Sequence, residues 1–291
     1  MRVTQRTLTE GVSHNLQAAV DRLNTLQERL SSGKAVQRPS DAPASAVAAL
    51  RYRADIRRSE QLKRNADDAQ GWLDSTDRAL TSGIGVLNRA RELVLQGNNG
   101  SMGVADRAAI AAEVDGLRQS LLAIGNTTYL GRPVFSGTAT GPQAYDATGS
   151  YLGDAGAVDR VVAPNVAVRA NLTGPAAFGP AGADAFAVLT ALADHLRTDP
   201  SQLQGDISAV DGALRRMTDA VAGIGARAKQ VDDLRVRLED GIVQSTNGLA
   251  EVESVDLPAT IIELQLQEVA YQAALGATAR VIQPSLLDFL R

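Results

Sequence analysis

The chain has 291 residues, of which 44% are hydrophobic and only 3% aromatic, and it contains no cysteine. Its formal net charge of −4 excludes a general attraction to nucleic acid or to anionic membranes. The lack of cysteine excludes disulfides and thiolate sites, and a core of small aliphatic residues with few rings is typical of closely packed helical bundles.

The N-terminal segment has no apolar run of signal-peptide length, and no stretch approaches the roughly 18 consecutive apolar residues of a membrane span. The first predicted helix carries apolar residues at gaps of three and four, which places them on one stripe. It ends at Gly33, a plausible C-cap. A turn over 38–43 follows, with Pro43 in the first turn of the next helix. The stripe consists of Leu16, Ala19, Leu23, Leu26 and Leu30.

The second predicted helix runs from about Ala44 to Gln96 and would measure about 80 Å at 1.5 Å per residue, which implies a rod. A third helix is predicted from Ala105 to about Asn126. The segment 131–182 is then rich in Gly, Pro, Thr and Val, a composition that predicts turns and β structure.

The last third returns to helical patterns, over 184–198, from Leu203 to Val252, and after Pro258 to near Pro284. The predicted fold is therefore mainly α with a small β insertion: an elongated antiparallel helical rod or bundle formed by the N- and C-terminal segments, with a β-rich middle domain at its tip. The predicted segments are 1–41 (assembly segment), 42–130 (rod), 131–183 (middle domain), 184–255 (rod) and 256–291 (assembly helix).

The two terminal segments each carry an apolar stripe and each lie beyond a break, at 33–43 and at 255–258. A single helix in water would leave the apolar side chains of either stripe exposed to solvent. The stripes therefore either pair with each other in the folded monomer or remain poorly ordered until they pack against neighbouring subunits. Periodicity alone leaves both readings open.

No catalytic, cofactor-binding or metal site is predicted. Neither His14 nor His195 has a recognisable set of catalytic partners in the sequence. The phosphate-binding and serine-nucleophile motifs are absent. The basic run from Arg51 to Arg64 is diluted by acidic residues and has one aromatic nearby, so we interpret it as a helix exterior or a contact with an acidic neighbour.

An ordered series of motifs resembles the bacterial flagellin family. Residues 28–33 (ERLSSG), 64–69 (RNADDA) and 89–100 (RARELVLQGNNG) match its N-terminal helical motifs, and 286–291 (LLDFLR) resembles its C-terminal end. The resemblance covers roughly 16–138 and 220–291. Within the family, 130–138 (LGRPVFSGT), 255–262 (VDLPATII) and 271–275 (YQAAL) favour a member at the hook–filament junction, with filament flagellin or a flagellin-like protein as the alternative.

The resemblance implies a structural, non-enzymatic protein of the extracellular flagellum, exported by the flagellar type III apparatus with the help of an export chaperone. It also implies that the chain forms a ring with identical subunits and contacts hook-associated protein 1 and flagellin. No nucleic acid, membrane, small-molecule substrate or cofactor is implied. The implied assembly interface consists of Leu16, Leu23, Leu26, Leu30, Ile261, Leu264, Tyr271, Leu275, Ile282, Leu286, Leu287, Phe289 and Leu290.

Overall fold

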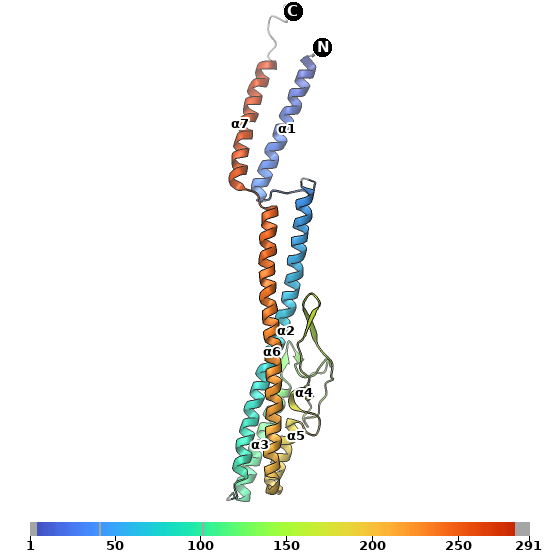
Figure 1. The fold of residues 1–291 in the computed structure, drawn as a ribbon, viewed down its shortest axis with the longest axis vertical. Helices are drawn as coiled ribbons and strands as arrows, with labels where there is room; N and C mark the ends of the chain where they lie inside the picture. The colour runs from blue at the N-terminus through green and yellow to red at the C-terminus, as the bar shows by residue number, and fades with distance from the viewer. Residues whose placement is uncertain (1–4, 41, 101, 283–291) are drawn as a thin grey trace, which may run out of the picture. The chain divides into compact units, whose positions relative to one another are not determined.

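The computed structural model describes residues 5–40, 42–100 and 102–282, and these are mostly helical (Figure 1). The prediction of a mainly helical chain with a small β insertion is confirmed. Two helices exceed fifty residues, α2 (Pro43–Gly97) and α6 (Leu203–Glu253). The other elements are α1 (Gln5–Ser32), α3 (Val104–Gly125), β1 (Thr128–Tyr129), β2 (Arg132–Pro133), β3 (Asp159–Ala163), β4 (Val166–Arg169), α4 (Gly174–Phe178), α5 (Ala185–Thr198), η1 (Pro200–Gln202) and α7 (Leu257–Ile282).

The chain divides into two compact units. One is built from Met1–Arg57 and Gly241–Arg291, and the other from Arg58–Asp240. The first therefore combines α1 and α7 with the first part of α2 and the last part of α6. The second contains the remaining elements and the main hydrophobic core.

In the unit Arg58–Asp240, α2 and α6 run antiparallel. Lys63 Nζ of α2 lies 2.8 Å from Glu239 Oε1 of α6, and Arg91 Nε lies 2.6 Å from Asp211 Oδ1. The α6 residue of each pair comes earlier in the sequence as the α2 residue comes later, so the two helices are antiparallel. Between these ion pairs, Leu80 and Leu87 of α2 are fully buried.

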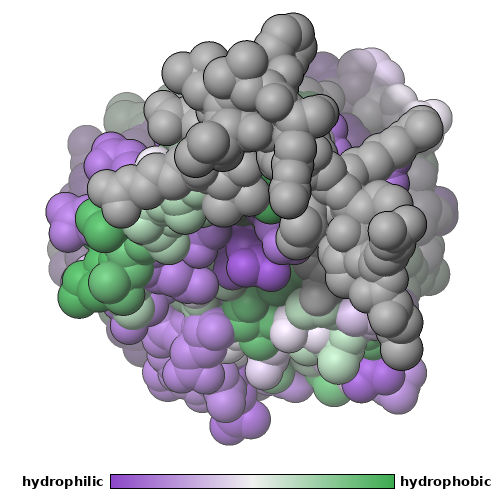
Figure 2. Space-filling model, turned by 90° about the horizontal axis from the view of Figure 1, so that it is seen from above, coloured by the Kyte–Doolittle hydropathy of each residue, from purple (hydrophilic) through white to green (hydrophobic). Residues whose placement is uncertain are grey.

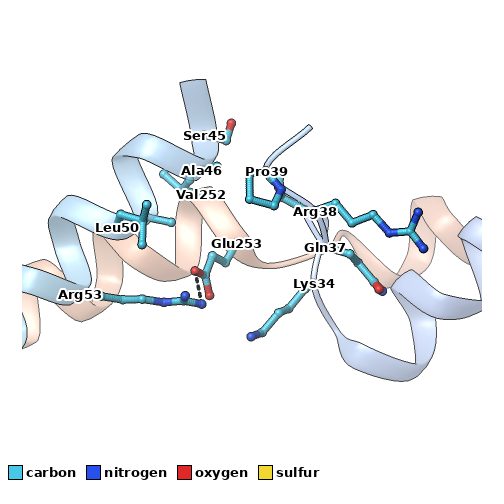
Figure 3. Close-up of a pocket in the computed structure, with 12 residues that line it drawn as sticks. Lys34, Gln37, Arg38, Pro39, Ser45, Ala46, Leu50, Arg53, Val252 and Glu253 are labelled. Atoms are coloured by element: carbon cyan, nitrogen blue, oxygen red, sulfur yellow. Dashed lines mark ion pairs between the residues drawn. The ribbon is translucent and has the colours of Figure 1, made fainter. Parts of the chain in front are cut away.

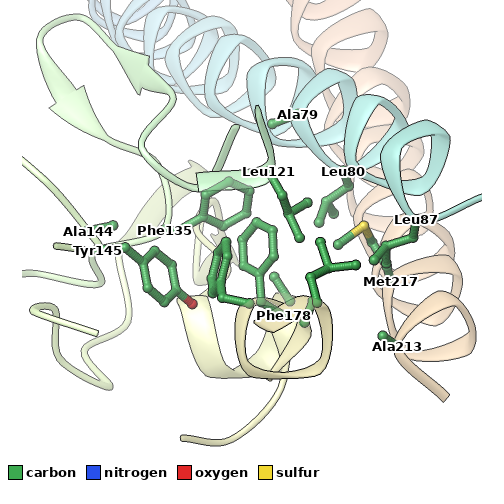
Figure 4. Packing of buried hydrophobic residues seen from close by; sticks show 14 of the residues in the cluster. Ala79, Leu80, Leu87, Leu121, Phe135, Ala144, Tyr145, Phe178, Ala213 and Met217 are labelled. Carbon is green, nitrogen blue, oxygen red and sulfur yellow. The ribbon is translucent and has the colours of Figure 1, made fainter. Parts of the chain in front are cut away.

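Several aromatic residues are gathered at one place in this core. The rings of Phe135 and Phe178 are 5.1 Å apart, and that of Tyr145 lies 4.7 Å from Phe186, which stacks on Phe178 at 5.1 Å. Figure 4 shows Phe135, Tyr145 and Phe178 near the side chains of Leu121, Leu80 and Met217. The aromatic cluster thus joins the middle segment to the helices, because rings at these separations and tilts attract beyond the area that they bury.

The strands of the middle segment form two hairpins, β1–β2 and β3–β4. Leu130 (φ 49°) and Gly131 (φ 77°) connect β1 to β2, and two successive positive φ angles are typical of a type I′ hairpin turn. Much of the rest is turn. Asp154 accepts hydrogen bonds from the backbone N–H and hydroxyl of Thr138 (2.7 and 2.6 Å) and from the Gly156 N–H (2.9 Å).

Candidate functional site

The helices α1 and α7 pack side by side in the unit that contains both ends of the described chain (Figure 1). Leu26 of α1 is buried, at 5% exposure. Thr260 is buried on α7, and Leu264 and Tyr271 are half-buried. These three α7 residues follow one another at gaps of four and seven, which places them on a single face. Of the predicted α7 residues, Leu264 and Tyr271 therefore share the buried side of the helix, while α1 and α7 pack on each other.

A second apolar face of α7 has no cover among the described residues. Ile262, Leu266 and Val269 are 60%, 66% and 64% exposed, and their gaps of four and three place them on one stripe. Thr260 lies two residues before Ile262, so this stripe points away from the face that packs on α1. Seen from above the view of Figure 1, Figure 2 shows green hydrophobic residues at the surface beside purple hydrophilic ones.

The predicted interface residues fall into three groups. Leu16, Leu23 and Leu30 are half-buried on α1 together with the buried Leu26. On α7, Ile261 and Leu275 are 45% and 43% exposed, in contrast to the half-buried Leu264 and Tyr271. Ile282 ends α7. The predicted residues Leu286, Leu287, Phe289 and Leu290 lie outside the described residues.

The stripe Ile262, Leu266 and Val269 was not among the residues predicted from the sequence. The sequence does contain a signal for this stripe, because these residues repeat at gaps of four and three, like those of the apolar stripe predicted for the first helix. Once one apolar stripe is assigned to an amphipathic helix, the opposite side is expected to be polar. In α7 an apolar stripe lies on that side too, and polar residues such as Glu263, Gln265 and Glu268 separate the two stripes.

The break after α1 and the break before α7 meet through their backbones. Lys34 and Ser254 form an isolated antiparallel bridge, in which the Ala35 N–H donates to the Glu253 carbonyl (2.7 Å) and the Val255 N–H to the Gly33 carbonyl (3.1 Å). The bridge holds the end of α1 next to the end of α6. It therefore fixes the points at which the terminal helices α1 and α7 connect to the long helices α2 and α6.

A pocket of about 240 Å³ lies beside this bridge. Arg53 of α2 and Glu253 of α6 point at each other across its wall (Figure 3) and form an ion pair of 2.6 Å. Leu50 and Val252 supply apolar lining. The pocket is a mixture of aliphatic and charged groups with the hydroxyl of Ser45, and its lining contains no histidine that could act as a general base for that hydroxyl, so it is better suited to a packing contact than to chemistry.

Chemical sites are not apparent elsewhere in the described residues. His195 Nδ1 lies 2.9 and 3.1 Å from the two carboxylate oxygens of the buried Asp206, so the pair ties α5 to α6. His14 is exposed on α1. In the described part of the chain no group of three or more His, Asp or Glu side chains is placed to hold a metal ion. No helix there is long and apolar enough to cross a membrane.

Comparison with known proteins matches residues 4–140 to the bacterial flagellin N-terminal helical region. Flagellar hook-associated protein 3 of Escherichia coli K12 is 25% identical over 277 residues, covering 86% of this chain and 87% of that protein. A flagellin of Halalkalibacterium halodurans is 26% identical over 266 residues, covering 91% and 90% respectively. The predicted resemblance is confirmed.

The fold is similar to that of solved structures. The crystal structure of hook-associated protein 3 from Legionella pneumophila is 16% identical and superposes with a TM-score of 0.62. The match covers 69% of this chain and 98% of that one. At this identity the match supports the fold, a set of long helices with a small β region.

Proposed function

We propose that the chain, a structural protein of the bacterial flagellum whose residues 4–140 match the bacterial flagellin N-terminal helical region, joins the hook to the flagellin filament. In this role it forms a ring of identical subunits between hook-associated protein 1 and the first flagellin subunits. It acts by packing of helices and not as an enzyme. The similarity to hook-associated protein 3 over most of both chains supports this place in the flagellum.

The observation that carries the proposal is the uncovered apolar stripe of α7. Ile262, Leu266 and Val269 are exposed, while the opposite face of the same helix packs on α1. A helix with apolar stripes on two sides normally packs against other elements on both of them. Burying an exposed aliphatic side chain is favourable by about 1.5 to 3 kcal/mol. Assembly with neighbouring subunits would supply the missing cover by coiled-coil packing.

The terminal helices belong to the same proposal. We propose that residues 1–41 and 256–291 are loosely held in the monomer and become fixed when they pack against neighbours, with Leu16, Leu23, Leu264 and Tyr271 in the contact. The partners would be identical subunits, hook-associated protein 1, flagellin and, before assembly, an export chaperone. Export would use the flagellar type III apparatus without a cleaved signal peptide.

A filament flagellin is the second candidate, supported by the similarity to the Halalkalibacterium flagellin over 90% of that protein. Immunogold labelling of intact flagella separates the two functions. The junction protein gives label at one point, where the hook meets the filament, and label along the whole filament would contradict it. A deletion strain of the junction protein makes hooks, releases flagellin into the medium and lacks filaments. A deletion of one flagellin does not give this combination.

A further inference from the structure

Helix α2 carries an exposed stripe near its start in which aliphatic and basic residues alternate. Val47, Arg51, Ala54 and Arg58 follow one another at gaps of four, three and four, and all four are exposed. Val47 is 50% exposed, and the neighbouring Leu50 is 58% exposed. This spacing places the residues on one seam of the heptad type.

Helix α6 carries a matching exposed stripe of opposite charge. Asp233, Val236, Asp240 and Val243 follow one another at gaps of three, four and three, and all are exposed. The valines are 48% and 59% exposed. An aliphatic residue again alternates with a charged one along a heptad-type seam.

The two stripes are complementary when the helices run antiparallel. Val47 then lies opposite Val243, and Ala54 opposite Val236, because both pairs are separated by seven residues along their own helix. The same register places Arg51 opposite Asp240 and Arg58 opposite Asp233. Every aliphatic residue thus meets an aliphatic residue, and every arginine meets an aspartate.

Within the described residues most of these charged side chains have no ion-pair partner. Arg51, Arg58 and Asp240 make no ion pair or hydrogen bond there, in contrast to their neighbours Arg53 and Lys63, which pair with Glu253 and Glu239 of α6. Asp233 has only an exposed contact of 2.7 Å with Lys229, one turn away on the same helix. Such exposed pairs contribute little and can be exchanged for another partner. The inner face of α2 is therefore satisfied within the chain, and the outer stripe is not.

We propose that the α2 stripe of one subunit packs antiparallel on the α6 stripe of a second copy of this chain. Both halves of the contact lie on every subunit, so the interface is heterologous and propagates from copy to copy, as a ring requires. The inference rests on the proposed structural function in the flagellum and adds to it the surfaces that join adjacent subunits. Complementary charges would set the register and the direction of the contact more than its strength.

The absence of native cysteine makes the contact directly testable by disulfide cross-linking. The full-length variant R51C/D240C replaces the native protein in the bacterium, and flagella are isolated and mildly oxidised. Non-reducing gels should then show disulfide-linked dimers and longer ladders. The matched control is E60C/D240C. Glu60 is also exposed on α2, but nine residues from Arg51 it projects from the opposite side of the helix, so most of the cross-linked product should be lost.

Charge reversal gives a second readout that does not depend on disulfide geometry. R51E and D240R should each reduce the amount of the chain retained in isolated flagella, more strongly at low salt, since exposed charges are screened at high ionic strength. The double variant R51E/D240R should restore the retained amount, because residue 51 of one subunit and residue 240 of the next again carry opposite charges. The exposure of both side chains predicts that the fold of each purified variant is unchanged, which circular dichroism checks.

The outcomes separate this interface from the proposed function. If the chain is present in flagella at the hook–filament junction but R51C/D240C gives no more cross-linked dimer than E60C/D240C, the interface is wrong and the function stands. Failure of the double charge reversal to rescue assembly also contradicts the interface. If the chain is present along the filament and cross-links, the interface stands and the junction role fails. If the chain is absent from flagella, both are wrong.

Discussion

Lys34 and Ser254 pair as an isolated antiparallel bridge, although 219 residues separate them in the chain. Through this bridge the break after α1 and the break before α7 become one joint. Gly33, one residue before Lys34, has φ +69°, and a Cβ at this position would meet nothing within 4 Å. The joint thus depends on backbone conformation and backbone hydrogen bonds more than on side chains.

Replacing Gly33 with alanine should therefore weaken the joint through backbone strain alone. The left-handed conformation costs a residue with a Cβ about 1 to 2 kcal/mol, and no steric clash adds to it. We expect faster protease cleavage between residues 30 and 40 in G33A, measured by the appearance of the shortened chain. The control is G11A, inside α1 and two turns from its start, where alanine should stabilise the helix by about 1 kcal/mol. Equal cleavage of G33A and the native chain would contradict the prediction.

Much of the helical architecture could be predicted from the sequence. The expected helix from Ala44 to Gln96 is α2 (Pro43–Gly97), and the expected C-cap at Gly33 has the left-handed conformation that such caps adopt. These features depend on local signals, namely periodicity, proline and glycine. Local signals suffice because a helix satisfies its hydrogen bonds within one segment.

The joint and the aromatic cluster could not be predicted in the same way. The bridge between Lys34 and Ser254 uses backbone groups, which every residue carries, so no side-chain pattern marks it. Phe135, Tyr145 and Phe186 meet only because turns bring distant segments together. The outer stripe of α7 was visible in the sequence, but its exposure depends on which face α1 covers.

Replacing Leu266 with aspartate should block assembly without unfolding the monomer. Leu266 is 66% exposed on the face of α7 away from α1, so a carboxylate there stays hydrated in the monomer but would be buried without a partner in a helix–helix contact. We expect L266D to have native circular dichroism and to leave cells without filaments. The control Q272D places the same charge at another exposed position of α7 and should assemble. Normal motility of L266D cells would contradict the proposed contact.

Limited proteolysis should remove both ends of the monomer and leave a stable core near residues 42–250. The terminal helices pack on each other while α7 keeps an apolar face uncovered, so they have few contacts to resist opening. Mass spectrometry of the fragments locates the cuts, which we expect at 33–42 and 254–257. Assembled flagella serve as the comparison, because the same sites should be protected there. Full protection of both ends in a proven monomer would exclude assembly-coupled ordering.

Truncation of Phe186 to alanine should cost about 3 to 5 kcal/mol of unfolding free energy, because a fully buried ring is removed from the core. Phe186 is 1% exposed and contacts both Tyr145 and Phe178. Urea unfolding followed by circular dichroism measures the loss. The control L130A, at a leucine that is 79% exposed, should change the stability by less than about 0.5 kcal/mol. A loss for F186A no larger than that for L130A would show that the cluster does not hold the middle segment.

The turns of the middle segment should loosen in acid because of Asp154. Hydrogen bonds from the Thr138 hydroxyl, and from the backbone N–H groups of Thr138 and Gly156, lower the pKa of Asp154 below its ordinary value of 3.8. A lowered pKa means that the folded chain binds the proton less readily than the unfolded chain does. The stabilisation is therefore complete above the ordinary pKa and is lost as the pH falls through the folded pKa.

Amide hydrogen exchange over residues 136–156, compared between about pH 5 and pH 3 after correction for the intrinsic exchange rate, should detect this loosening. The variant D154N lacks the titrating carboxylate and should already exchange faster at the higher pH. Its protection should also change less between the two pH values than that of the native chain. Asp146 has a lowered pKa for the same reason, through the Thr148 hydroxyl and the Ser150 N–H, so D154N should retain part of the acid response. An acid response of these residues that is identical in D154N and the native chain would show that Asp154 does not control them.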